Sequence, residues 1–143
     1  MTTDQAAHAP YVRAVVAAIE RAGLDVDEWY ADPNDPRDAA ITLDRSATRA
    51  AYGERPVVLG WTEERGWYWG VDGHGDGVLG QLFDSPMPDV VADPARVAEW
   101  ARTVADGTTA RWPVTGRRRD DDDDEGGFVD ALRSYWPRED LPA

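Results

Sequence analysis

Apolar positions near the N-terminus recur with the period of a helix. Tyr11, Val15 and Ile19 repeat every four residues and place one apolar stripe on a segment of about residues 10–22. Pro10 suits the first helical turn and Gly23 suits the position just past the end. The same features predict a second helix, which is marked by Asp93, Pro94, Val97, Trp100, Ala101, Val104 and Gly107.

Between these helices the apolar residues alternate, as they do in strands. The pattern predicts strands at residues 27–31, 38–43, 55–62, 67–71 and 78–83, with one or two helical turns at 45–52. Short turns join them, so neighbouring strands are expected to be antiparallel. Trp61 and Trp67 flank the turn at residues 63–66 and are expected to face each other across it. The predicted fold is α+β: an antiparallel sheet of about five strands with both helices packed on one face.

The chain changes character after residue 106. Residues 107–127 combine arginines, an aspartate run and glycines, which predicts a charged flexible linker after a domain at 1–106. Residues 128–143 then form a short amphipathic segment, with Phe128, Val129, Leu132, Tyr135 and Trp136 at helical spacing. Such a short helix is marginal alone, so we expect it to dock, either on its own body or on a partner.

The net charge of −13 belongs mainly to the domain and not to the aspartate run. Residues 1–106 contain 19 acidic residues and nine arginines. An acidic surface repels nucleic acid and anionic membranes, and it favours a cation or a basic protein partner. It also permits an alternative, in which the protein imitates DNA and inhibits a nucleic-acid-binding protein.

Residue usage narrows the setting. The chain has no cysteine, which excludes disulfides and thiolate chemistry, and no membrane-spanning run or signal peptide is visible. We therefore expect a cytoplasmic protein without a cofactor. All 15 basic residues are arginine, which suggests a bacterium with a GC-rich genome.

Four short motifs give residues 10–106 a resemblance to a family of small acidic actinobacterial proteins classed as a domain of unknown function. They are Tyr11-Val12-Arg13, Asp35-Pro36-Arg37-Asp38, Glu64-Arg65-Gly66-Trp67 and Asp93-Pro94. The resemblance implies a bacterial, cytoplasmic α+β domain and supplies no catalytic residues.

Catalysis finds little support in the residues. None of the serines lies in a nucleophile elbow. Of the two histidines, His8 is expected in a frayed terminus, which leaves His74 as the candidate base. The sequence therefore predicts a protein that is not an enzyme.

A glycine-rich loop at residues 72–77 contains possible metal ligands. Asp72, His74 and Asp76 alternate as in the first half of a calcium-binding loop, but Phe83 occupies the position of the final bidentate glutamate. The competing interpretation is a solvated turn rich in glycine and aspartate.

Six aromatic residues gather on the predicted strands. They are Trp29, Tyr30, Trp61, Trp67, Tyr68 and Trp69. Because strand side chains alternate, some of these rings belong to the face that the helices leave uncovered, where they would form a binding surface. The competing interpretation places them all in the core.

The residues together favour a non-enzymatic protein-interaction or regulatory module. The aromatic sheet face or the C-terminal segment would bind the partner. The alternatives are an acidic inhibitor of a nucleic-acid-binding protein, and a protein that binds a small ligand or a divalent metal at residues 72–77.

Overall fold

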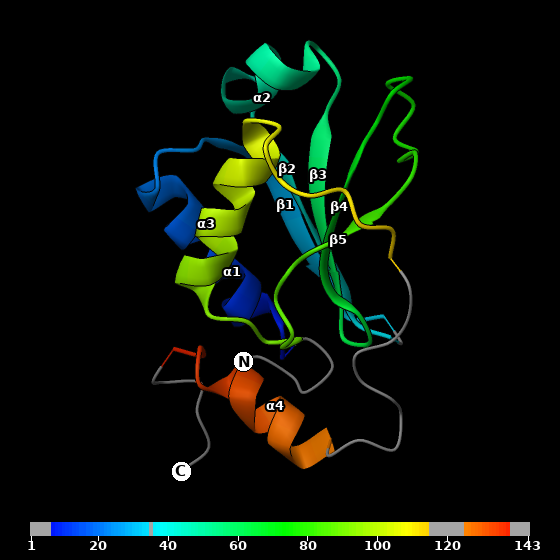
Figure 1. The fold of residues 1–143 in the computed structure, drawn as a ribbon. Coiled ribbons are helices and arrows are strands. Elements are labelled where there is room, and N and C mark those ends of the chain that lie inside the picture. The colour runs from blue at the N-terminus through cyan, green and yellow to red at the C-terminus, as the bar shows by residue number, and fades with distance from the viewer. Residues whose placement is uncertain (1–6, 35, 115–124, 138–143) are drawn as a thin grey trace.

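One antiparallel sheet with strand order β1-β2-β3-β4-β5 organises the molecule (Figure 1). The computed structural model describes residues 7–34, 36–114 and 125–137. Its elements are α1 (Ala9–Arg21), β1 (Val26–Asp32), β2 (Asp38–Leu43), α2 (Arg45–Tyr52), β3 (Val57–Thr62), β4 (Gly66–Val71), β5 (Phe83–Asp84), α3 (Pro94–Ala105) and α4 (Glu125–Arg133). The predicted α+β class is confirmed. Within the described ranges, no helix is both long and apolar enough to cross a bilayer.

Strand alternation gives the sheet two different faces. Helices α1 and α3 lie together on one side of the sheet (Figure 1), and Ile41, Leu59 and Trp69 are fully buried beneath them. Trp61 and Trp67 are paired across β3 and β4, as predicted, and both also belong to this core. The opposite face carries smaller or more polar side chains, and no helix of the described residues lies over it.

The last predicted strand, at residues 78–83, is wrong. Strand β5 has only two residues, Phe83 and Asp84, which pair with Trp69 and Tyr68. The preceding residues fold back over the end of β4, where the Gly80 N–H donates to the Val71 carbonyl oxygen at 3.1 Å and two leucines pack close to Gly70. Leu82 and Leu79 come within 3.1 and 3.3 Å of the position that a Cβ on Gly70 would occupy.

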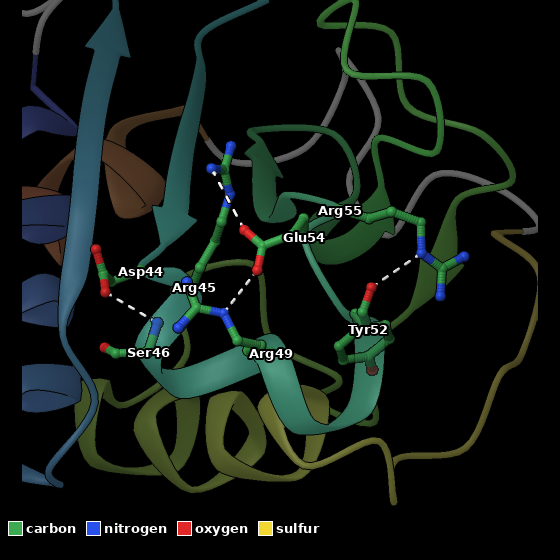
Figure 2. Close-up of polar contacts among 7 residues, drawn as sticks. All are labelled: Asp44, Arg45, Ser46, Arg49, Tyr52, Glu54 and Arg55. Atoms are coloured by element: carbon green, nitrogen blue, oxygen red, sulfur yellow. Dashed lines mark hydrogen bonds and ion pairs between the residues drawn. The ribbon is translucent and has the colours of Figure 1, made fainter.

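Helix α2 connects β2 to β3 and is held by local polar contacts (Figure 2). The Asp44 carboxylate accepts a hydrogen bond from the backbone N–H of Ser46 at 3.0 Å and caps the helix. At the other end Arg49 pairs with Glu54 at 2.7 Å, on the exposed surface. The Tyr52 hydroxyl donates to the carbonyl oxygen of Val104, which binds α2 to α3.

Helix α4 docks on its own body. Phe128 stacks on Trp61 with ring centroids 6.4 Å apart, and the Trp136 indole N–H donates to the Ala7 carbonyl oxygen at 2.9 Å. Leu132 is fully buried, and Phe128, Val129 and Trp136 are nearly so, which corrects the hypothesis that this apolar stripe is offered to a partner. The helix begins three residues earlier than predicted; residues 115–124 and 138–143, which complete the predicted linker and segment, lie outside the described residues.

Candidate functional site

A hollow of about 430 Å³ lies on the uncovered face of the sheet. We call it the sheet hollow. Strands β2 and β3 provide its floor, β1 and β4 provide tyrosines, and the loop after β4 forms a wall. Its lining residues are Glu28, Tyr30, Asp38, Ala39, Ala40, Thr42, Pro56, Val58, Gly60, Tyr68, Asp72, Gly75, Gly77 and Leu79. The volume falls in the range of small-molecule and side-chain binding sites.

The sheet hollow exists because two small residues stand between two tyrosines. The strand register aligns Tyr30 with Ala40, Ala40 with Gly60, and Gly60 with Tyr68, in one row across four strands. The Tyr68 ring lies across Gly60, where a Cβ would collide with its ring carbons and hydroxyl. A larger residue at Ala40 or Gly60 would therefore fill the space or displace the ring.

The loop that forms the wall is organised by one carboxylate. Asp72 accepts hydrogen bonds from the backbone N–H groups of His74 at 3.3 Å, Gly75 at 2.7 Å and Gly77 at 2.7 Å. These bonds favour the ionised form and lower the pKa of Asp72. Asp72 is buried in the turn that it shapes, whereas His74 and Asp76 are exposed.

This geometry overturns the predicted metal site. Asp72 directs its oxygens at backbone donors and not at a shared point with His74 and Asp76. Across residues 7–34, 36–114 and 125–137, no group of three histidine, aspartate or glutamate side chains is arranged to hold a metal ion. These contacts fit the competing interpretation of a turn rich in glycine and aspartate, with Asp72 as the residue that shapes the turn.

The lining of the sheet hollow is acidic. Glu28, Asp38 and Asp72 contribute carboxylates, and the described lining residues include no arginine, lysine or histidine. Burial, followed by nearby Asp38 and Asp32, raises the pKa of Tyr30; burial, followed by Tyr30 and Asp38, raises the pKa of Tyr68. Both phenols therefore keep their protons at neutral pH and can donate hydrogen bonds.

The aromatic residues predicted to form one surface divide between the two faces. Trp61, Trp67 and Trp69 are fully buried in the core, so their assignment to a binding surface is wrong. Trp29 is half-buried on the covered side, with the Arg13 guanidinium 6.0 Å from its ring. Tyr30, which is 50% exposed, and Tyr68 remain at the sheet hollow. Alternation along β1 and β4 separates the two groups.

His8 is not in a frayed terminus, contrary to expectation. It is fully buried, stacks on Trp61 at 5.6 Å, and places Nε2 3.0 Å from the carbonyl oxygen of Asp38. Because a carbonyl can only accept, Nε2 carries the proton. Burial is the main cause that lowers the pKa of His8, so the ring is neutral at pH 7. These contacts make His8 part of the packed core.

A buried ion pair, which the sequence did not reveal, joins the connection between β1 and β2 to the turn between β3 and β4. Arg37 Nη1 contacts Glu63 Oε2 at 2.5 Å, and the Arg37 backbone N–H donates to Glu63 Oε1 at 3.1 Å. The Arg37 guanidinium also lies 5.9 Å from the Phe128 ring of α4. Arg37 belongs to one of the motifs on which the family resemblance rests, and its role here is structural.

A second hollow, of about 630 Å³, lies between α1 and α3 beside Tyr135. Alanines are half of its lining residues, and the lining carries both charges, as Arg21, Arg102 and Glu99 show. Its charged residues are of both signs, whereas the charged residues that line the sheet hollow are all acidic.

A family model described as a family of unknown function (DUF6292) matches residues 11–103. No curated protein and no solved structure matches the chain. The matched range extends from α1 into α3 and includes every residue that lines the sheet hollow, whereas α4 lies outside it.

Proposed function

We propose a binding function for this chain, which belongs to the DUF6292 family, a family of unknown function. The protein is a non-enzymatic interaction module, and the sheet hollow takes a basic side chain from a segment of a partner protein. The single observation that supports this most is the row in which Tyr30 and Tyr68 flank Ala40 and Gly60, beside carboxylates.

An arginine side chain fits this arrangement chemically. Its planar guanidinium stacks on aromatic rings and forms paired hydrogen bonds with carboxylates. Tyr30 and Tyr68 supply the aromatic rings of the lining, and Glu28 and Asp38 supply carboxylates, of which Asp38 Oδ1 also accepts a hydrogen bond from the Asn34 side-chain amide at 3.0 Å. The net charge of −13 would attract a basic partner from a distance and speed its association.

The lining favours binding over nucleophilic catalysis. The described residues around the sheet hollow include no serine, cysteine or histidine, and the Asp72 carboxylate is already engaged by backbone donors. The alternative of an acidic inhibitor of a nucleic-acid-binding protein rests on charge alone and stays a prediction.

Titration with N-acetyl-arginine amide tests the proposal. Tyr30→Ala should weaken binding about five- to tenfold, because it removes one ring face from the guanidinium. Trp112→Ala is the matched control: Trp112 is an exposed aromatic residue, 56% accessible, which does not line the sheet hollow. N-acetyl-glutamate amide should not bind. Equal affinities of the two variants for the arginine ligand would contradict the proposal.

A further inference from the structure

One edge of the sheet lies open beside the sheet hollow. Strand β1 is the terminal strand, and no other strand pairs with its outer side within the part of the chain that the structure describes. The opposite edge differs. There, residues 112–114 lie alongside β5. The Asp84 N–H donates to the Trp112 carbonyl oxygen at 2.6 Å, and Phe83 forms an isolated β-bridge with Pro113.

We infer that the basic partner segment binds as an extended strand added to the outer edge of β1. This inference rests on the proposed function and states how the partner reaches the site. Glu28 and Tyr30, two residues apart on β1, both line the sheet hollow. A strand beside β1 would place every second side chain on the same face, within reach of these two residues.

The charge of β1 selects a basic strand over a second copy of this chain. Asp25, Asp27, Glu28 and Asp32 lie on or next to the strand, and residues 22–36 contain no arginine or lysine. Two copies of this edge would repel each other, because like charges oppose each other across paired strands. The register shift between Val26 and Glu28 further disfavours a long, flat pairing of two identical edges.

Backbone methylation of a peptide separates strand addition from simple charge attraction. The peptide has six residues, alternately arginine and threonine, and two versions carry N-methyl groups either on all three arginines or on all three threonines. In an added antiparallel strand only alternate N–H groups face the neighbour. One version should therefore bind at least about tenfold more weakly than the unmethylated peptide, while the other stays within about threefold.

The possible results separate the two proposals. If both methylated peptides bind alike, whether weakly or tightly, strand addition is overturned, and N-acetyl-arginine amide still reports on the sheet hollow independently. Glu28→Arg should lower the affinity for the unmethylated peptide at least about tenfold, because it places a like charge beside the added strand. Glu99→Arg on α3 makes the same charge change away from the sheet hollow, and an equal loss in that variant would also overturn the inference.

Discussion

Two glutamates pair with arginines in different surroundings, and the difference sets the contribution of each pair to stability. Glu63 and Arg37 are both buried, with side chains 11% and 7% exposed. Glu54 and Arg49 are exposed, at 67% and 61% (Figure 2). Water screens the exposed pair, whereas the buried pair is shielded from water and interacts more strongly.

Glu63→Gln should therefore lower the free energy of unfolding by about 3–5 kcal/mol, because it breaks a buried ion pair by neutralising the carboxylate that contacts the Arg37 guanidinium. Glu54→Gln should cost less than about 1 kcal/mol. Urea denaturation of the two variants measures both values. Similar losses would show that the Arg37–Glu63 pair is accessible to water.

His8 should make stability depend on pH just below neutrality. Burial lowers the pKa of folded His8 below the ordinary value of 6.5, so the unfolded chain takes up this proton first as the pH falls. The contribution of His8 is complete above pH 6.5 and is lost as the pH falls toward the folded pKa.

Urea denaturation between pH 7.5 and 5.5 measures this dependence. His8→Gln should reduce the slope of stability against pH in that window, whereas His74→Gln, a change at an exposed residue, should keep it. If His8→Gln keeps the wild-type slope of stability against pH, the pH dependence belongs to another group.

Among the elements, α4 gives the sharpest prediction. The sequence did not decide whether this helix docks on its own body or on a partner. Leu132 is fully buried against the body, whereas the side chain of Asp130 on the same helix is 77% exposed. Leu132→Ala should cost about 2–5 kcal/mol of unfolding free energy, and Asp130→Ala less than about 0.5 kcal/mol. Equal effects in thermal or urea unfolding would mean that α4 does not stay docked in solution.

The elements that the sequence predicted well are those defined by local pattern. Pro94 and Gly107 bracket α3, and the turn between Trp61 and Trp67 sets the register of its hairpin. The strand predicted at 78–83 is wrong because Leu79 and Leu82 pack against Gly70 of the preceding strand, a tertiary contact that the local pattern does not show. Intrinsic strand preference is weak enough for such packing to override it.

The candidate site was predictable only in part, for a similar reason. Alternation alone places Tyr68 and Trp69 on opposite faces, but it does not say which face the helices cover. The sheet hollow requires Ala40 and Gly60 to be neighbours across strands, and that depends on register between distant segments. The turn-forming role of Asp72 could be predicted from the local sequence, because an aspartate ahead of glycines commonly accepts hydrogen bonds from the following backbone.

At the scale of the whole molecule, the fold assigns different tasks to its two sheet faces. One face buries Trp61, Trp67 and Trp69 under α1 and α3, with α4 adding to the same core. The other is not covered by any helix that the structure describes, is acidic at the sheet hollow, and borders the outer edge of β1. The central claim is that this open face is where a basic partner segment binds.

Mapping backbone amide shifts by NMR during titration with N-acetyl-arginine amide tests that claim most directly. The account predicts that the largest shifts fall on Tyr30, Ala40, Gly60 and Tyr68, which form the row across the sheet hollow. It also predicts that Glu20 and Glu99, exposed acidic residues on the helices, stay unchanged. Shifts spread evenly over all acidic surfaces, or concentrated on α1 and α3, would contradict it.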